Sequence, residues 1–381
     1  MRKICVVVNS RANYGRIKSV LHEINKHPGL ELQLIVGASA LLYRFGNVKE
    51  IIENDGFRIN ATVYSVIEGE NPTTMAKSVG IAIVELATLF ENFKPDIVIT
   101  VADRFETIAT AISASYKNIS VAHTQGGEIT GSIDESVRHA ITKLSHIHFP
   151  ATEKASDNII RMGEDPSTVH MVGCPSIDIV TNIDLGLPPN IFNKYKGVGK
   201  ALVPDLPYLV VVQHPVTTEY GRGLEQINET LKAVDAVGMQ VAWLWPNVDA
   251  GSDDISKGLR MYRESKRQGH IHFYRNFEVE DFVRLIANSE GLVGNSSSAL
   301  REGSFLGLPA VNIGTRQQYR EHADNVKFVD YDSRKIEEAI RCQINNGRYQ
   351  PSYLYGRGNS AEKIAEILYE AKISIQKRLH Y

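Results

Sequence analysis

The sequence predicts an α/β protein whose strands form open, mostly parallel sheets in two successive domains. Short apolar runs rich in β-branched residues alternate with helical segments, which is the pattern of parallel strands covered on both faces. The 381 residues suffice for two domains of ordinary size. A Gly- and Pro-containing segment at residues 186–189 separates two such series. We therefore place the domains at residues 1–184 and 185–358, and expect a helix in residues 359–381 to cross back to the first domain.

Composition excludes several classes of function. The net charge of −2 offers no basic face for nucleic acid or an anionic membrane. Cys5, Cys174 and Cys342 are isolated and lack metal-type spacing, which fits a reducing compartment. We find no secretion signal, and no run that approaches the roughly 20 apolar residues of a membrane span. We therefore expect a cytoplasmic protein without nucleic-acid or membrane partners.

The first βαβ unit places an arginine at the end of a strand. The run Ile4–Val8 predicts a buried strand, residues 9–15 a polar loop, and the segment to about Lys26 an amphipathic helix. No G-x-G-x-x-G motif follows the strand, which argues against a nicotinamide or flavin site. Ligands of open α/β sheets bind at the carboxyl ends of strands. Arg11 is therefore expected to contact a phosphate or carboxylate, with an ordinary surface role as the alternative.

A second strand end carries a carboxylate. Pro72–Phe93 predicts a long helix and Ile97–Val101 a fully apolar strand, which Asp103 and Arg104 follow. One interpretation is a helix-capping aspartate beside a surface arginine. The other is a carboxylate at the mouth of the sheet, and this pattern alone leaves both open.

The next strand, residues 119–123, leads into a loop rich in glycine and hydroxyl residues, and a helix is expected over residues 136–144. Its glycines allow the backbone to fold closely over a ligand. The region carries three carboxylates: Glu128, Asp134 and Glu135. With Asp103 on the adjacent strand end, this is more acidity than capping requires, so acid/base chemistry becomes the better interpretation.

The second half of the chain repeats this logic. Strands are expected at residues 147–150 and 169–172 to complete the first sheet, and the second series begins at Tyr208–Val212. His214 lies just beyond that strand. Each strand of the second series again ends in one or two polar residues, which places polar side chains at a common edge.

The segment that begins at Gly291 is the clearest candidate for an anion site. Gly291–Gly294 predicts a short buried strand, residues 295–298 a polar turn, and the following residues a helix. A helix N-terminus with free N–H groups and a positive dipole end suits a phosphate or pyrophosphate. Simple helix capping by Ser and Asn is the alternative. Arg316, expected at the end of the next strand, favours an anionic ligand.

Several stretches together carry a family resemblance: residues 10–14, 102–106, 125–139, 173–176, 213–218, 246–251, 294–298 and 314–317. In their joint order they resemble the UDP-N-acetylglucosamine 2-epimerase family, in particular its hydrolysing, sialic-acid-pathway branch. The resemblance implies the GT-B architecture, an α/β fold with two Rossmann-like doubly wound domains that face a cleft. It also implies that the enzyme needs no cofactor and no metal.

The resemblance assigns roles that the local patterns left open. The expected catalytic residues are Asp103, Glu128, one or both of Asp134 and Glu135, and His214 near the phosphates. The expected substrate-binding residues are Arg11, Asn13, Arg104, Asn247, Ser296, Ser297, Ser298, Glu302 and Arg316. Glu302 matches the glutamate that holds the ribose hydroxyls. Gln125 stands where the non-hydrolysing relatives have a glutamate, which favours the hydrolysing branch and moves acid/base work to Glu128 and Asp103.

The implied reaction converts UDP-N-acetylglucosamine and water into N-acetylmannosamine and UDP, by elimination to a glycal and hydration with inversion at C2. This reaction would supply sialic acid synthesis. The alternatives are the same reaction on UDP-2,4-diacetamido-2,4,6-trideoxyglucose, a GT-B glycosyltransferase, or a non-catalytic nucleotide-sugar sensor. The expected partners are the UDP-sugar and UDP, and the family suggests a homo-oligomer, a dimer or tetramer.

Overall fold

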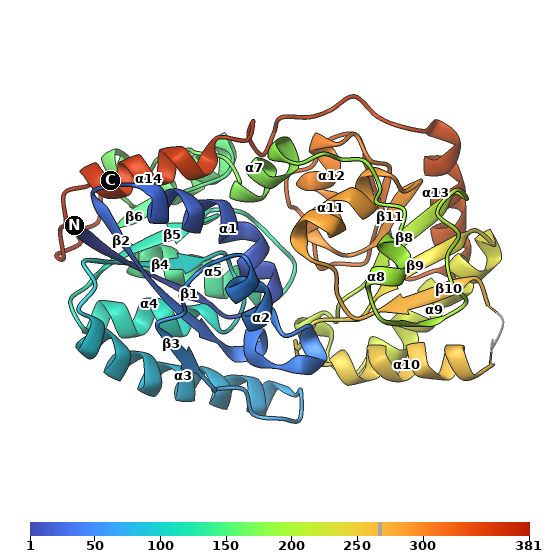
Figure 1. The fold of residues 1–381 in the computed structure, drawn as a ribbon, viewed down its shortest axis with the longest axis horizontal. Coiled ribbons are helices and arrows are strands. Elements are labelled where there is room, and N and C mark those ends of the chain that lie inside the picture. The colour runs from blue at the N-terminus through green and yellow to red at the C-terminus, as the bar shows by residue number, and fades with distance from the viewer. Residues whose placement is uncertain (266–268) are drawn as a thin grey trace.

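The computed structural model describes residues 1–265 and 269–381 and consists of two α/β domains side by side (Figure 1). The first sheet has the strand order β3-β2-β1-β4-β5-β6, and all its pairs are parallel. Its strands are β1 (Arg2–Val8), β2 (Leu30–Gly37), β3 (Ala61–Val63), β4 (Ile97–Val101), β5 (Ser120–Thr124) and β6 (Ile147–Phe149). The accompanying α-helices are α1 (Arg11–Lys26), α2 (Val48–Asn54), α3 (Pro72–Phe93), α4 (Thr107–Tyr116), α5 (Asp134–Leu144), α6 (Glu153–Arg161) and α7 (Pro175–Asn182).

The second sheet has the order β13-β12-β11-β8-β9-β10-β7, and β7 alone among these strands pairs antiparallel. Its strands are β7 (Gly197–Gly199), β8 (Tyr208–Val212), β9 (Gln240–Leu244), β10 (Ile271–Tyr274), β11 (Gly291–Gly294), β12 (Ala310–Ile313) and β13 (Val326–Val329). The remaining α-helices are α8 (Ile191–Lys194), α9 (Gly223–Val237), α10 (Ser252–Ser265), α11 (Val279–Ala287), α12 (Glu302–Phe305), α13 (Ser333–Asn346) and α14 (Ser360–Glu370).

Each sheet contains a point at which the strand order reverses. In the first sheet it lies between β1 and β4, and in the second between β8 and β11. Every residue of β4 and β8 is buried, because helices cover both faces of these central strands. At such a reversal the two neighbouring connections leave in opposite directions and open a crevice for a ligand. The segments that follow these four strands begin near Arg11, Asp103, His214 and Ser296.

Helix α14 returns to the first domain, where it lies beside α1 near both chain ends (Figure 1). Its apolar side chains Ile364 and Leu368 belong to the same buried cluster as Ile4 and Ile17. The helix ends at Glu370, however, so it fills only the first part of residues 359–381, in which the sequence predicted a helix. The last eleven residues form no regular element, and Lys377 anchors them by an ion pair with Glu164 (2.6 Å).

Two helices begin earlier than predicted, and one predicted strand is almost absent. α1 starts at Arg11 because the side chain of Ser10 accepts a hydrogen bond from the N–H of Asn13 (3.2 Å), so Arg11 lies in a first helical turn and not in a loop. α5 starts at Asp134 instead of residue 136. Residues 169–172 contribute a single bridge between Val169 and His148.

Helix α3 corrects the prediction that no run approaches a membrane span. Its 22 residues contain a window with a mean hydropathy of 1.4, of which 22% is buried, so α3 is long and apolar enough to cross a membrane by these two criteria. Its buried residues Ser78, Ala82, Leu86 and Phe90 recur every fourth position, and three of them belong to the apolar cluster under the first sheet. Length and composition therefore describe equally well an outer helix that covers a sheet.

Candidate active site

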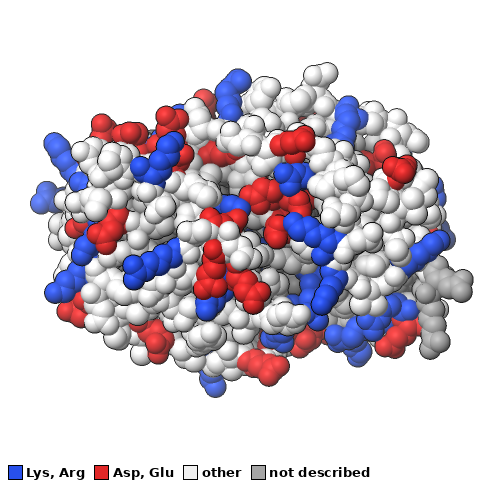
Figure 2. Space-filling view, in the orientation of Figure 1, with Lys and Arg blue, Asp and Glu red and all other residues white. Residues whose placement is uncertain are grey.

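A cavity lies between the domains, where the two sheet reversals face each other. Charged side chains gather along the line where the domains meet (Figure 2). Ten of the residues predicted to form the site line this cavity: Arg11, Asp103, Arg104, His214, Asn247, Ser296, Ser297, Ser298, Glu302 and Arg316. The other four, Asn13, Glu128, Asp134 and Glu135, are not among the residues that line it. The predicted set therefore converges in space from both domains.

The first turn of α1 contributes Arg11 and Asn13 in different ways. Arg11 donates across the cleft to the Asn276 side-chain oxygen (2.8 Å). Burial and neighbouring Arg104 lower the pKa of Arg11 to about 10, so it stays charged at neutral pH. Asn13 is fully buried, and its amide donates to the carbonyl of Val101 (3.2 Å). Asn13 thus ties α1 to the end of β4 and does not line the cavity.

The turn after β11 differs from the predicted helix start. Ser296 accepts from the N–H of Ser298 (3.3 Å) and caps a single 3₁₀ turn, Ser297–Ala299, and the short α12 follows. A four-residue helix has little macrodipole, so the helix-dipole argument for anion binding does not apply here. Hydroxyls, N–H groups and guanidinium groups remain as donors, and Arg16 donates to the Ser297 hydroxyl (2.7 Å).

His214 presents one neutral N–H donor. Its Nδ1 accepts from the backbone N–H of Asn247 (3.2 Å), and because that group can only donate, the ring proton lies on Nε2. Burial, followed by Arg316, Arg11 and Arg104, holds the pKa of His214 well below its usual value. The ring is therefore neutral at pH 7 and offers Nε2–H to the cavity that it lines.

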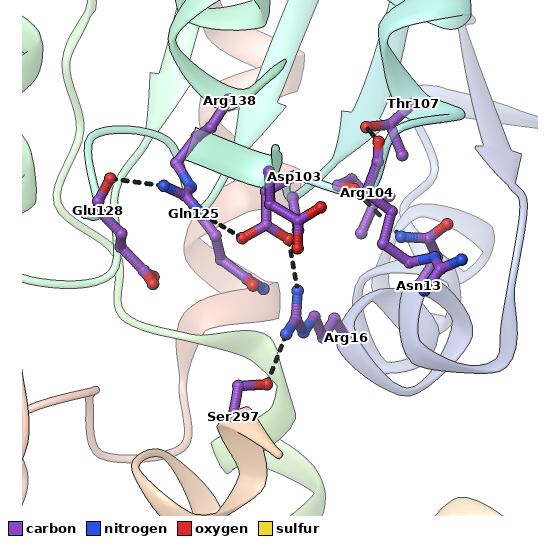
Figure 3. A network of polar contacts seen from close by, with 12 residues as sticks. Asn13, Arg16, Asp103, Arg104, Thr107, Gln125, Glu128, Arg138 and Ser297 are labelled. Atoms are coloured by element: carbon purple, nitrogen blue, oxygen red, sulfur yellow. Dashed lines mark hydrogen bonds and ion pairs between the residues drawn. The ribbon is translucent and has the colours of Figure 1, made fainter. Parts of the chain in front are cut away.

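Asp103 is held as a carboxylate by three arginines, of which Figure 3 shows Arg16 and Arg138. The guanidinium nitrogens of Arg138, Arg320 and Arg16 lie 2.5, 3.0 and 3.4 Å from its oxygens. Burial raises the pKa of Asp103, but the three positive charges outweigh burial and hold the pKa well below its usual value. Asp103 is therefore ionised throughout the neutral range.

Glu128 and Glu135 are also paired with arginine. Both oxygens of Glu128 lie 2.7 Å from Nη2 of Arg301, and Nε of Arg320 lies 2.9 Å from one of them. Although burial opposes it, Arg301 and then Arg320 lower the pKa of Glu128. Glu135 accepts from Arg138 (2.8 Å) and interacts with His139 (2.8 Å). Both carboxylates are therefore held ionised, and neither lines the cavity.

Asp134 is the predicted carboxyl group that titrates near neutrality. Burial and the charge of Asp103 raise its pKa to about 6, and nearby Asp249 adds to this effect. Arg316 opposes the shift from 3.6 Å. A group with this pKa can both release and deliver a proton at physiological pH.

The sequence interpretation gave no site role to five charged residues found here: Arg16, Arg138, Arg301, Arg320 and Asp249. Asp249 forms ion pairs with Arg104 (3.0 Å) and Arg316 (3.9 Å). It lies in residues 246–251, one of the stretches that carried the resemblance, so its position was a usable signal. Arg16 and Arg320 each follow a predicted binding arginine by four or five residues, a spacing that alone predicts nothing.

Comparison with known proteins places the chain in a family. The family model described as UDP-N-acetylglucosamine 2-epimerase matches residues 22–369. The chain belongs to the UDP-N-acetylglucosamine 2-epimerase family. This confirms the resemblance that the motifs indicated.

Members of this family are similar over nearly the whole chain. The UDP-N,N'-diacetylbacillosamine 2-epimerase (hydrolyzing) of Legionella pneumophila is 33% identical over 368 residues, which are 97% of this chain and 96% of that protein. The polysialic acid biosynthesis protein P7 of Escherichia coli is 32% identical over 343 residues, 89% of this chain and 85% of that protein.

A solved structure shows the fold. The UDP-GlcNAc 2-epimerase of Methanocaldococcus jannaschii, solved in complex with UDP-GlcNAc and UDP, superposes with a TM-score of 0.79 at 17% identity. The match covers 97% of this chain and 100% of that chain. The predicted fold class, two Rossmann-like domains in the GT-B arrangement, is thereby confirmed for this epimerase-family chain.

Proposed function

We propose that the protein is a hydrolysing 2-epimerase that converts a UDP-linked 2-acetamido sugar and water into UDP and the free 2-epimeric sugar. The observation that carries the proposal is a difference between two carboxyl groups at one edge of the cleft. Asp103 is held ionised, whereas the pKa of neighbouring Asp134 is about 6. One group that accepts a proton and one that can deliver a proton are what inversion at a C–H centre requires.

The reaction breaks the C2–H bond and the bond from C1 to the diphosphate oxygen. The electrons of the C2–H bond form the C1–C2 double bond, and UDP leaves with the C1–O electron pair. Water then adds its oxygen to C1 while a proton reaches C2 from the opposite face. We assign these two proton transfers to Asp103, which lines the cavity whereas Glu128 and Glu135 do not, and to Asp134, the carboxyl group whose pKa is about 6.

The second-domain edge, together with Arg11 of α1, supplies the groups that would bind the leaving UDP. UDP departs more easily when donors meet the charge that develops on its oxygen. Arg11, Arg316 and neutral His214 line the cavity beside the hydroxyls of residues 296–298. We assign the diphosphate to these groups. Glu302, also in the cavity wall, would hold the ribose hydroxyls, as the family resemblance implies.

Two substrates fit this chemistry. UDP-N-acetylglucosamine would give N-acetylmannosamine for sialic acid supply, and the similarity to the polysialic acid protein P7 supports it. The similarity to the Legionella enzyme supports UDP-2,4-diacetamido-2,4,6-trideoxyglucose instead. Both substrates share the UDP group and the 2-acetamido carbon at which the reaction occurs.

We also propose an oligomeric state and a cellular location for the protein. We propose a homo-oligomer, because α3 exposes Ile81 (38%) and Val84 (67%) on its outer face. We propose the cytoplasm, where the thiols of Cys5, Cys174 and Cys342 stay free. Light scattering of the purified protein measures its mass directly, and a monomer would contradict the proposed homo-oligomer.

The decisive experiment incubates the enzyme with each UDP-sugar in D₂O without acceptor and follows the products by proton NMR. Free sugar with inverted C2, deuterium at C2 and stoichiometric UDP supports the hydrolysing reaction, and the faster substrate identifies the physiological class. An intact epimeric UDP-sugar would overturn hydrolysis in favour of simple epimerisation. Turnover that requires an added acceptor would favour the glycosyltransferase alternative.

A further inference from the structure

A continuous chain of buried polar contacts connects Asp103 at one end of the site with His214 at the other. Nη2 of Arg320 pairs with Asp103 (3.0 Å), and its Nη1 donates to the Gln317 side chain (2.7 Å). Gln317 donates to the backbone carbonyl of Asn295 (3.0 Å), and the Asn295 side chain accepts from the N–H of His214 (2.7 Å). The five residues are at most 6% exposed.

The direction of each contact is fixed by chemistry. A guanidinium can only donate, so Gln317 must turn its oxygen toward Arg320 and its NH₂ group toward the carbonyl of Asn295. Asn295 likewise accepts from the N–H of His214 and donates to its carbonyl (2.8 Å). Neither the Gln317 amide nor the Asn295 amide can flip without losing two hydrogen bonds, so these contacts hold Asp103 and His214 in one arrangement.

Arg320 is distinguished among these five residues by its ion pairs. Besides Asp103, it pairs through Nε with Glu128 (2.9 Å), and within residues 1–265 and 269–381 no other arginine forms ion pairs with both carboxylates. It does not line the cavity itself. Arg320 comes from the segment after β12 in the second domain, whereas both carboxylates belong to the first.

We propose that Arg320 is a positioning residue that couples the carboxylate end of the site to the His214 end through Gln317 and Asn295. Binding of a diphosphate beside His214 is thereby linked to the placement of Asp103. The names of the two ends rest on the function proposed above, but the coupling itself is a property of the contacts.

The charges around Asp103 give the coupling a pH signature. Asp103 faces Arg16 of α1, Arg138 of α5 and Arg320, and the carboxyl groups of Asp134 and Glu128 lie near enough to influence it or its arginines. Without Arg320, two of the three positive charges remain against the effect of burial. The pKa of Asp103 then rises.

The test compares Arg320→Met, Arg320→Lys and Gln317→Met with the wild type. Arg320→Met is expected to lower kcat at least tenfold, weaken UDP binding about fivefold or more in calorimetry, and move the acidic limb of the kcat/KM profile to higher pH. Arg320→Lys keeps the charge near Asp103 and is expected to restore that limb. Gln317→Met removes the hydrogen bonds that join Arg320 to Asn295. It is expected to weaken UDP binding without moving the acidic limb of the kcat/KM profile.

A control variant and a stability measurement complete the test of the coupling. Arg341→Met, at an exposed pair on α13, serves as the control with unchanged kinetics. Stability against pH does not depend on turnover. Asp103 stabilises the fold above its unfolded pKa, and this contribution is lost as pH falls through its folded pKa, so in Arg320→Met, where the folded pKa is higher, the loss is complete at a higher pH. A wild type that binds UDP but does not turn over would refute the proposed function and leave this stability measurement decisive. Folded Arg320→Met with unchanged UDP affinity and an unchanged acid midpoint would overturn the coupling.

Discussion

Arg301 and Glu128 belong to different domains, yet a single guanidinium nitrogen, Nη2 of Arg301, lies 2.7 Å from both oxygens of Glu128. Nη1 of the same arginine donates to Gln125 (2.8 Å) and lies 3.1 Å from the Cys174 sulfur. All three partners are buried. The loop that contains Glu128 is therefore shaped by the second domain as much as by its own glycines.

We predict that Glu128→Gln destabilises the protein by about 3 kcal/mol, because the mutation leaves the Arg301 guanidinium buried without a counter-charge. Denaturant unfolding measures this change. The matched control is Glu337→Gln, which breaks the exposed pair with Arg341 and should cost below about 1 kcal/mol. Equal stabilities of the two variants would contradict the prediction.

Asp134→Asn is predicted to reduce kcat by at least about 10²-fold, because the asparagine amide cannot exchange a proton at C2. UDP binding should change little, since Asp134 is not among the groups assigned to the diphosphate and those groups all remain in the variant. The wild-type kcat profile should contain a limb near pH 6, the pKa of Asp134, that is missing from the variant. A variant with wild-type turnover would exclude Asp134 from the chemistry.

The same substitution makes a prediction about stability. The pKa of Asp134 is raised from 3.8 to about 6, so its protonated form favours the fold below pH 3.8 and this contribution is lost as pH rises through 6. Asp134→Asn is therefore expected to be more stable than the wild type at pH 8, by about 2 kcal/mol, and similar to it at pH 4. Thermal unfolding at the two pH values checks the sign.

Arg316→Ala should weaken UDP binding by about 10- to 100-fold, which corresponds to the loss of one charge-assisted hydrogen bond. Arg316 lines the cavity and donates to the carbonyl of Asn295 (3.3 Å). Isothermal titration with UDP gives the affinity. Arg222→Ala removes an arginine that pairs with exposed Glu225 outside the cavity, and it should bind UDP normally.

Lys377→Met is predicted to loosen the C-terminal tail and lower stability by about 1–2 kcal/mol. The Lys377 ammonium pairs with Glu164 and donates to carbonyls at the end of α5, including that of Lys143 (3.0 Å). Limited proteolysis should cut the variant's tail faster. Lys372→Met, at an exposed position of the same tail, is the control. A tail equally resistant in both would refute this role for Lys377.

Much of the fold was predictable because parallel strands buried on both faces must be continuously apolar. Residues 97–101, 208–212 and 291–294 were assigned with the bounds that the structure has. β10, with a histidine among its four residues, and β13, a partly exposed edge strand, do not show that pattern and were not assigned. The converse error is residues 169–172, which were assigned as a strand and contribute only one bridge, between Val169 and His148.

The candidate site was predictable to the extent that it depends on strand ends. Residues such as His214 and Arg316 follow central strands, and topology alone brings them to one edge. The pairing of Glu128 with Arg301, and of Asp103 with Arg320, depends on how the two domains face each other. No local pattern contains that information, so the sequence interpretation gave acid/base work to Glu128 and Asp103 without the arginines that bind them.

The path of the chain between the domains has a mechanical consequence. It crosses once after α7 and returns before α14 (Figure 1). The second domain is therefore inserted within the first and is joined to it by two connecting segments. Together these two connecting segments restrict how one domain can move relative to the other. They permit rotation about the line through both crossings and oppose twisting about any axis perpendicular to that line. Any opening of the cleft should therefore follow a single rotational path, which returns Arg301 and Arg320 to the same carboxylates at each closure.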